Sequence, residues 1–251
     1  MKQLIQIFLF ISFSTYSPAQ IIYIEKIRAI PRNESYTTKD STLVFPVFRI
    51  KNKKVENKIN QKLQDDFKKE GHIEKQEHNI GSMLIKASKD GLTDMDIQVI
   101  YQTKKIISFS LQKGGMGAYP TTWQTQYCFN LETGNLITLD SLIDETHKKD
   151  FLRSVKKKQG TNIKSNKKKL LNQLHKKEID KETYQLAMEA MKDNCWTYYN
   201  PQKFTIDRTT LTIIIDCDFP HAILTLSPDS DIKLQLKSIS QYINKKYQYL
   251  L

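Results

Sequence analysis

The stretch MDIQVIYQTKKIISFSLQKGGMGAYPTTWQTQYCFNLETGNLITL, residues 95–139, decides the fold. Apolar or β-branched residues occupy every second position over residues 95–101, 107–111 and 123–131. Such alternation is typical of strands that bury one face, and short turn-forming links between such strands favour hairpins. The last link contains Gly134, which can adopt the positive φ that a tight turn needs. We therefore predict an antiparallel meander.

The glycine-rich link GGMGAYP needs its own interpretation, because glycine clusters also form phosphate-binding loops. Such a loop requires a lysine and a hydroxyl after its last glycine, or a helix that faces the anion. Here an aromatic residue, a proline and a strand follow instead. We therefore expect Gly114 and Gly115 to allow a hairpin turn, and Tyr119 and Pro120 to fix the exit into the strand of Trp123.

The segments before the meander predict strands and one helix. Residues 21–50 have an extended pattern, in which Pro46 indicates an edge strand or a bulge. Over residues 51–71 apolar side chains recur every four positions, and Gly71 follows the last of them. This spacing predicts an amphipathic helix that packs on the sheet. Its apolar positions are Val55, Ile59, Leu63 and Phe67.

The segments after the meander change character. Residues 144–193 predict basic helices, with a break between the first two at the QGTN sequence of residues 159–162. A strand pattern returns at residues 204–206 and then as an alternation over 211–219, and a short helix is expected at 238–245. The order of strands, helices and strands indicates an α+β fold with an antiparallel sheet, an N-terminal packing helix and a basic helical block before the last strands.

The N-terminus predicts export. Residues 1–19 combine a lysine, an apolar run and a small-residue end, which is the layout of a secretory signal peptide. No later segment is apolar for the ~20 residues that a span needs, so no transmembrane span is expected in the mature chain. We divide that chain into a strand-helix segment, residues 20–90, and a sheet domain, residues 91–251, with a helical insertion at about 144–193.

The net charge of +12 favours partners with negative charge. Export makes an anionic component of the envelope the expected kind, and we expect no nucleic acid. Lysines are densest in the helical block, at Lys156–Lys158 and Lys167–Lys169. They form either a solvated face or an electrostatic landing patch for a diffuse anionic surface.

Three cysteines, Cys128, Cys195 and Cys217, allow one disulfide and one spare thiol in an oxidising compartment. The spacing does not decide the pairing, and we prefer Cys195 with Cys217. The sequence contains no C-x-x-C, which leaves zinc-ribbon and thioredoxin-type sites unsupported.

Candidate catalytic groups are few. His72 and His78 lie among three glutamates, but no H-E-x-x-H is present, and a solvated charged loop is the expected structure. Asp216 and Asp218 are two apart on the last predicted strand, as are Asp94 and Asp96 on an earlier one, so each pair shares a face. Spacing alone does not make such a pair catalytic. We expect no catalytic residue, no metal and no cofactor.

The segment ISFSLQKGGMGAYPTTWQTQYCFNLETGNLITLDSLI, residues 107–143, resembles the extracytoplasmic domain of RsiV-type anti-sigma factors. The same domain accompanies the catalytic domain of PdaC-type peptidoglycan deacetylases. The shared features are Gly-Gly, then Ala-aromatic-Pro, then Phe-Asn-Leu, Thr-Gly and a Leu-Thr-Leu-like turn into Asp. Residues 45–63 are similar to the strand and helix that accompany this domain. Residues 219–222 are similar to its Pro-aromatic-Ala loop, without the usual following glycine.

The resemblance implies a binding module, because RsiV-type proteins use this domain to bind lysozyme and no segment here matches a sigma-binding or deacetylase part. The expected partner is a lysozyme-like protein, peptidoglycan or another anionic envelope component. We predict a contact face of two loops, comprising Gly114, Gly115, Tyr119, Pro120, Trp123, Pro220 and His221. The alternatives are an envelope hydrolase using Asp216, Asp218 or the histidine cluster of residues 72–78, and a structural protein held to anionic polymer or lipid by the lysine helices.

Overall fold

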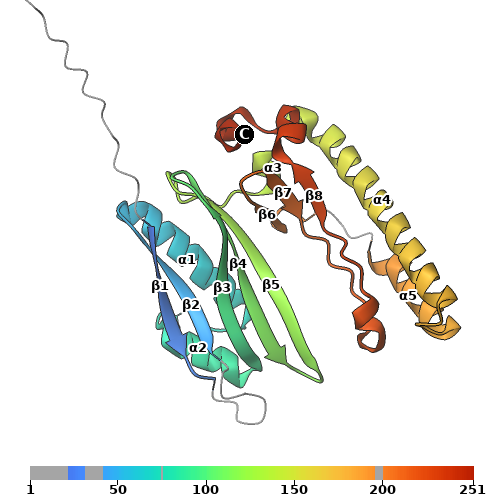
Figure 1. Cartoon of the computed structure of the whole chain (residues 1–251). Helices are drawn as coiled ribbons and strands as arrows, with labels where there is room; N and C mark the ends of the chain where they lie inside the picture. The colour runs from blue at the N-terminus through green and yellow to red at the C-terminus, as the bar shows by residue number, and fades with distance from the viewer. Residues whose placement is uncertain (1–21, 32–41, 75, 196–199) are drawn as a thin grey trace, which may run out of the picture.

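The chain folds into two lobes that lie side by side, residues 22–136 and residues 137–251 (Figure 1). The computed structural model describes residues 22–31, 42–74, 76–195 and 200–251, so the predicted signal peptide lies outside the described residues. Within the described part of the chain, no helix is long and apolar enough to cross a membrane. Helices and antiparallel-dominated sheets occur in both lobes, which confirms the predicted α+β class.

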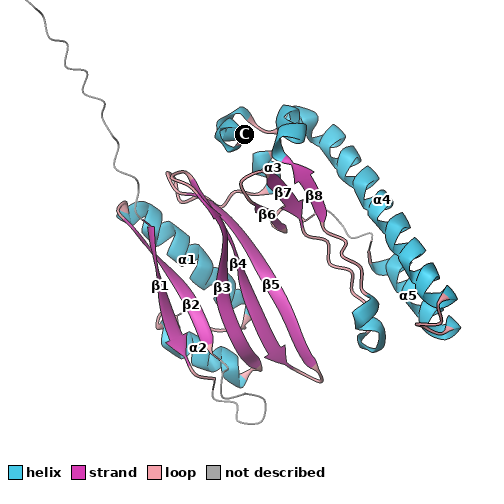
Figure 2. Cartoon of the chain, in the orientation of Figure 1, coloured by secondary structure: helices cyan, strands magenta, loops and turns pink. Residues whose placement is uncertain are grey.

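The first lobe is a five-stranded sheet in the order β1-β2-β3-β4-β5, with two helices against one face (Figure 2). All neighbouring strands are antiparallel except β2 and β3. The predicted meander is confirmed as β3 to β5. The predicted division at residues 90 and 91 falls just before β3, inside this lobe. The elements are β1 (Ile22–Ala29), β2 (Leu43–Ile50), α1 (Lys53–Glu70), α2 (Ile80–Lys89), β3 (Leu92–Gln102), β4 (Ile106–Met116) and β5 (Pro120–Asn130).

The core of the first lobe lies between the sheet and the two helices. The four apolar positions predicted on α1 are all buried, and Gly71 caps the helix with an N–H to the Phe67 carbonyl at 2.9 Å. The alternation in β4 and β5 places Phe109, Tyr127 and Phe129 in one stack of rings in this core. Helix α2, which was not predicted, covers the same face and buries Met83, Leu84 and Ala87.

Pro46 lies in β2, which is an inner strand by order, so the prediction of an edge strand or bulge is wrong as stated. The physical reason is that β2 pairs with β3 only at Leu43 and Met95. Beyond that point, side chains of α1 rather than the backbone of β3 form the hydrogen bonds on this side of β2. Asn60 hydrogen bonds both backbone groups of Phe48, and the Glu56 carboxylate accepts the Ile50 N–H at 2.7 Å. Alternate residues of a strand point their backbone groups to the same side. Pro46, which has no N–H to donate, therefore faces the side of β2 that forms no ladder of hydrogen bonds with β3.

The glycine-rich link is a hairpin, but its turn lies later than predicted. Gly114 and Gly115 belong to β4 and pair with Thr122 and Thr121 of β5, so they do not form the turn. The reversal takes place over residues 117–119, where the Gly117 N–H donates to the Tyr119 carbonyl at 3.3 Å. The other predicted turn is confirmed, because Gly134 has a φ of +70°.

The second lobe is a three-stranded antiparallel sheet with long helices on its outer side (Figure 1). The predicted break at residues 159–162 is wrong: α4 runs through it, because Val155, Gln159 and Ile163 are all buried along one side of the helix. The elements are α3 (Leu139–Leu142), α4 (Lys148–His175), α5 (Lys181–Asn194), β6 (Phe204–Ile206), β7 (Thr210–Ile213) and β8 (Ile232–Gln235), with 3-10 helices Glu145–His147, His221–Leu226, Leu236–Tyr242 and Lys245–Leu250.

Two further predictions for this lobe need correction. The strand predicted at 204–206 is confirmed as β6, whereas the alternation over 211–219 forms a strand only in part, since β7 ends at Ile213 and residues 214–220 have no regular structure. The helix expected at 238–245 is instead two 3-10 helices separated by Ile243 and Asn244.

The lobes share a second core at one end of the molecule. Ile106 of β4 and Cys128 of β5 point away from the first core and pack with Phe204 and Ile206 of β6. The Ser108 hydroxyl in the same region accepts the Ile206 N–H at 3.1 Å. The two faces of β4 and β5 thus serve two different cores, which fixes the second lobe against the first.

Candidate functional site

The two loops of the predicted contact face meet in the structure. Tyr119, at the tip of the β4–β5 hairpin, stacks on His221, whose ring centroid lies 4.5 Å away with an interplanar angle of 23°. The two residues are 102 positions apart in a chain in which each lobe supplies one of them. This contact joins the lobes at the end opposite to their shared core.

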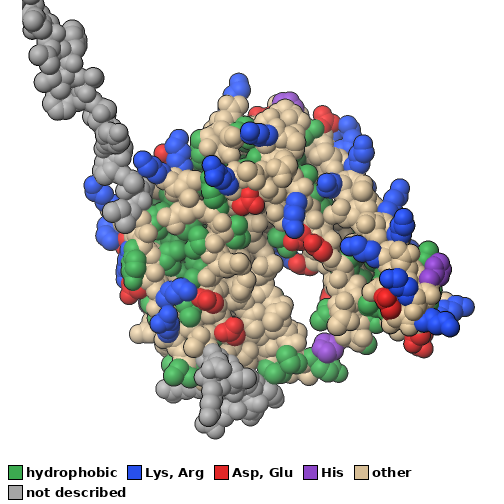
Figure 3. Space-filling view, viewed as in Figure 1, with side chains coloured by type: hydrophobic (Ala, Val, Ile, Leu, Met, Phe, Trp, Pro, Cys, Tyr) green, Lys and Arg blue, Asp and Glu red, His purple; other side chains and the backbone are tan. Residues whose placement is uncertain are grey.

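A cleft lies between these two contacts. Figure 3 shows it as an opening between the lobes, and its volume is about 760 Å³. This is within the ~300–1,000 Å³ of ordinary ligand sites. Its walls are the first half of β5 on one side and the segments before β6 and after β7 on the other. The lining residues are Thr122, Trp123, Gln124, Thr125, Gln126, Asn200, Gln202, Lys203, Asp216, Cys217 and Asp218.

The β5 wall is polar because of the strand period. Tyr127 and Phe129 face the first core, so the residues of the other parity face the second lobe. Near the shared core this second face carries the buried Cys128, but further along it carries Thr122 and Gln124, which are exposed. An uncharged, hydrogen-bonding wall therefore extends from the shared core toward the Tyr119 end.

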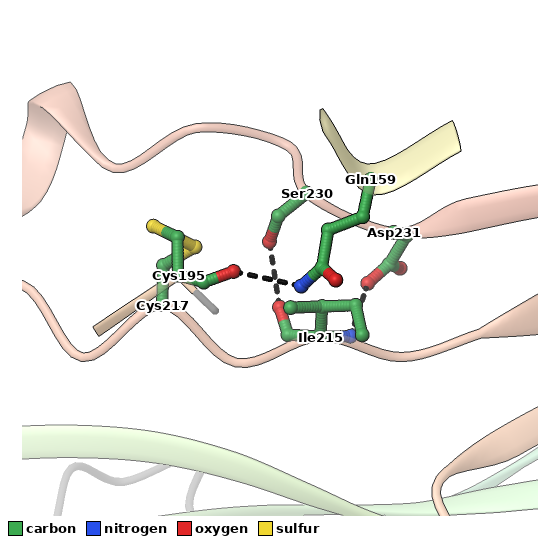
Figure 4. The surroundings of a disulfide bond; sticks show 6 residues. All are labelled: Gln159, Cys195, Ile215, Cys217, Ser230 and Asp231. Carbon is green, nitrogen blue, oxygen red and sulfur yellow. Dashed lines mark hydrogen bonds between the residues drawn. A yellow bond between two sulfur atoms is a disulfide. The ribbon is translucent and has the colours of Figure 1, made fainter. Parts of the chain in front are cut away.

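The opposite wall is held in place without a sheet. A disulfide joins Cys195, at the end of α5, to Cys217 (Figure 4), so the preferred pairing is confirmed. The Asp231 carboxylate accepts the Ile215 N–H at 3.1 Å, and the Ser230 hydroxyl donates to the Ile215 carbonyl at 2.6 Å. These side chains supply residues 214–220 with the kind of hydrogen bonds that a neighbouring strand would supply. They hold this segment so that Asp216 borders the cleft.

Buried groups support this wall from behind. The buried Gln159 of α4 donates to the Cys195 carbonyl at 2.8 Å (Figure 4). Burial raises the pKa of Asp231 above its ordinary value, although the Ile215 N–H opposes the shift and the neighbouring Asp229 adds to it. The wall is therefore held in part by the half-buried carboxyl group of Asp231, and its burial makes this group harder to ionise.

The charged groups in the cleft are Lys203, Asp216 and Asp218, and the first two form an ion pair. Asp216 is thus engaged by a lysine. The described residues contain no cluster of three His, Cys, Asp or Glu side chains able to hold a metal ion. The geometry provides hydrogen-bonding partners and a surface for contact.

Trp123 lies mainly on the other side of β5. Its indole N–H donates to a Glu70 oxygen at 2.6 Å, and the buried Lys113 pairs with the other oxygen of that carboxylate. A side chain on Gly115 would lie 2.8 Å from the Trp123 ring, so glycine leaves room for the indole there. A second cavity of about 490 Å³ opens beside these groups and also borders His72.

The predicted face is therefore divided between two sides of the hairpin. Gly115 and Trp123 border the Glu70 cavity, and Gly114 and Pro120 border another, of about 550 Å³, beside Asp94. Pro220 precedes the 3-10 helix that carries His221. The structure brings Tyr119 and His221 together directly, and whether these residues bind a partner stays a prediction.

The lysines of the helical block lie on the outside of the second lobe. Lys156, Lys157, Lys158, Lys168 and Lys169 are exposed, and Lys and Arg side chains gather along the α4 side of the molecule in Figure 3. Helix α4 itself lies on the side of the second lobe that is away from the first lobe (Figure 1). The choice between a solvated face and a landing patch stays open.

Sequence reasoning missed several cleft residues. Asn200, Gln202 and Lys203 precede a three-residue strand and form no motif with β5. The one usable signal is β5 itself, whose sequence PTTWQTQYCFN contains no charged residue in a chain that is 26% charged.

No protein-family model and no curated protein matches this sequence. Among solved structures the neighbours are proteins of DUF3298, an uncharacterised domain family. A DUF3298 family member from Bacteroides fragilis has a TM-score of 0.51 and 12% identity, and the match covers 90% of this chain and 94% of that one. A DUF3298 family protein from Pseudomonas aeruginosa has a TM-score of 0.52 and 7% identity, with 90% and 95% covered.

At these identities the likeness establishes the fold, which this chain shares over nearly its whole described length. Neither neighbour's description names an activity or a ligand. The resemblance to RsiV-type and PdaC-type domains stays a prediction.

Proposed function

We propose that this protein is an exported, non-enzymatic binding module of the cell envelope, and that it captures an envelope-directed protein in the cleft between its lobes. The partner class that the RsiV-type resemblance suggests is a lysozyme-like protein. Export is supported by the signal-peptide pattern of residues 1–19 and by a disulfide, which persists in oxidising compartments.

The observation that carries the proposal is the stack of Tyr119 on His221. Two loops far apart in sequence meet beside an open cleft, and aromatic side chains are enriched where proteins bind other proteins. Tyr119 is 58% exposed even in this stack, so much of its surface remains available for contact.

Envelope glycan is a second candidate, favoured by the amide side chains in the cleft. Gln124, Asn200 and Gln202 each carry a side-chain amide with a donor and an acceptor, which suits ligands rich in hydroxyl groups. The Lys203–Asp216 pair adds a charged donor and acceptor to the same space. A glycan strand would be held by hydrogen bonds, with little help from net charge.

The test is binding of the mature chain to a c-type lysozyme and, separately, to purified peptidoglycan, each at low salt. Tyr119→Ala and His221→Ala should each weaken retention of the true partner about five- to thirtyfold, as expected when a contact aromatic worth about 1–2 kcal/mol is truncated. Tyr23→Ala is the matched control, because Tyr23 is 63% exposed on β1, far from the cleft.

Retention of neither ligand by the wild-type protein would refute the proposal. Release of soluble muropeptides from the peptidoglycan, abolished by Asp216→Asn, would instead support the hydrolase alternative. Binding that survives both rim substitutions but is lost at high salt would place the contact on the lysine helices.

A further inference from the structure

Along the free edge of β5, several backbone groups have no hydrogen-bond partner in the part of the chain that the structure describes. β5 is the last strand of its sheet, so β4 pairs with only one of its sides. On the other side, the Asn130 N–H donates to the Asn135 carbonyl at 2.9 Å, and the Cys128 carbonyl accepts the Ile137 N–H at 2.7 Å. The end of the strand next to the shared core is therefore closed by the chain itself.

The first half of this edge is open. Since hydrogen-bonding direction alternates along a strand and the β4–β5 register has no bulge, residues of the same parity as Cys128 and Asn130 point their backbone groups outward. These are Gln126, Gln124 and Thr122. None of their N–H or C=O groups has a partner among the residues that the structure describes. Thr122 and Gln124 are exposed, and Gln126 is buried where the lobes meet.

This edge also lacks the features that keep sheet edges from pairing. Natural edge strands are usually interrupted by charges, prolines or bulges. The opposite edge strand, β1, follows that pattern with Glu25, Lys26 and Arg28. β5 carries no charge along its eleven residues, and its one proline, Pro120, stands at the first position. The unprotected part faces the cleft.

We propose that the cleft takes an extended polypeptide segment of a partner protein, which adds to β5 as a sixth strand by pairing with Thr122 and Gln124. Strand addition of this kind gains affinity from main-chain hydrogen bonds and specificity from alternate side chains. The proposal rests on the proposed function in one respect, that the cleft is a binding site, and it names the mode of recognition and the chemistry of the partner.

The volume of the cleft limits which kind of partner can enter it. A volume of about 760 Å³ between two lobes suits a short single segment, because the edge of a second folded copy brings its helices and neighbouring strands with it and needs far more room. The open edge from Pro120 to Gln126 spans about 20 Å at ~3.4 Å per residue, which corresponds to roughly six residues of partner chain.

The two faces of β5 define the side-chain pattern of that segment. Residues of the guest on the Trp123 and Thr125 face lie beside an indole that is 39% exposed, which favours aromatic or β-branched neighbours. Residues on the other face lie among Gln124, Gln126 and the Lys203–Asp216 pair, which favours polar side chains. The expected segment alternates apolar and polar residues.

The first test uses the free protein. Amide hydrogen exchange measured by NMR should show slow exchange at Trp123, Thr125 and Tyr127, whose N–H groups face β4, and fast exchange at Thr122 and Gln124. The difference should be at least about a hundredfold, as between laddered and open amides. Protection of Thr122 and Gln124 in the free protein would mean that the edge is covered, and the proposal would be wrong.

The second test uses heptapeptides selected from a random display library on the immobilised mature chain. Selected peptides should protect the Thr122 and Gln124 amides. N-methylation at alternate peptide positions should weaken binding about tenfold in one parity, where a hydrogen bond to β5 is lost, and less than twofold in the other. Gln124→Pro in the protein should weaken binding similarly, because it removes only an outward-facing donor.

The outcomes separate the two proposals. If lysozyme or peptidoglycan binds and depends on Tyr119, but no peptide shows the N-methylation parity, strand addition is wrong and the binding module stands. If peptides bind with that parity and neither lysozyme nor peptidoglycan is retained, strand addition stands and the proposed partners are wrong. Equal weakening by N-methylation in both parities, or selection of no peptide at all, overturns strand addition.

Discussion

The side-chain amide of Asn60 hydrogen bonds both backbone groups of Phe48, accepting the N–H at 2.8 Å and donating to the carbonyl at 2.9 Å. An asparagine side chain carries the same donor and acceptor as a peptide unit. One residue of α1 therefore stands in for the strand that β2 lacks beyond its single bridge to β3.

Asn60→Leu should lower the free energy of unfolding by about 1–3 kcal/mol, because it leaves the Phe48 N–H and C=O without partners in a partly buried place. Chemical denaturation of the variant and the wild type measures this. Asn57→Leu is the matched control, since Asn57 is exposed on the same helix and should change stability by less than about 0.5 kcal/mol. Equal effects at the two positions would contradict the role given to Asn60.

Gly115→Ala should displace the Trp123 indole, because the new methyl group would lie 2.8 Å from two ring carbons. We expect a loss of about 1–3 kcal/mol, typical of overpacking, and a shifted indole N–H resonance as its bond to Glu70 changes. Gly117→Ala is the control, because nothing lies within 4 Å of the added atom. An unmoved indole resonance in Gly115→Ala would count against this packing.

The Cys195–Cys217 disulfide closes a loop with a sequence separation of 22. Replacing both cysteines by serine should cost about 3 kcal/mol on the loop-entropy model and loosen the cleft wall at Asp216. Native protein should show no thiol reactive to Ellman's reagent, and denatured protein one, because Cys128 is buried and burial raises its pKa to about 12. A reactive thiol in the native state would contradict the burial of Cys128.

Asp231 should make the fold less stable as the pH rises. Its pKa is above the ordinary value in the folded state because of burial, so the folded chain holds the proton to a higher pH than the unfolded chain. Stability is therefore lost as the pH rises from about 4, the unfolded value, through the folded pKa. Asp231→Asn keeps an oxygen for the Ile215 N–H and should melt at a higher temperature than wild type at pH 7, with the difference gone near pH 3. A variant that melts lower at pH 7 would oppose this.

The sequence predicted the elements whose pattern is local and long. The alternation from Met95 to Leu131 and the four-residue spacing on α1 follow directly from which side chains are buried. Helix α2 was missed because ten residues give fewer than three turns of pattern. Gly160 did not end α4, because burial of residues on either side outweighs the ~1 kcal/mol that a helical glycine costs.

The candidate site depends on contacts that no local pattern contains. Tyr119 meets His221 between two lobes that also pack together through Ile106 and Cys128 against β6, at the other end of the interface. The end of β7 at Ile213 could not be predicted from the sequence either. The side chains of Ser230 and Asp231 form the hydrogen bonds to the backbone that follows, where the alternation predicted a strand. The lack of charge in β5 was evident from the sequence. That it belongs to an edge strand became evident only from the strand order.

The stack of Tyr119 on His221 makes the opening between the lobes a closed ring, with the shared core as its other boundary. A closed ring restricts how a segment of a partner can enter the opening. A segment with a free chain end can thread through, whereas a segment inside a folded partner can enter only while the two aromatic rings are apart. For such partners the association rate would be set by how often that contact opens, and the Tyr119→Ala variant would admit them faster even while it holds them less tightly.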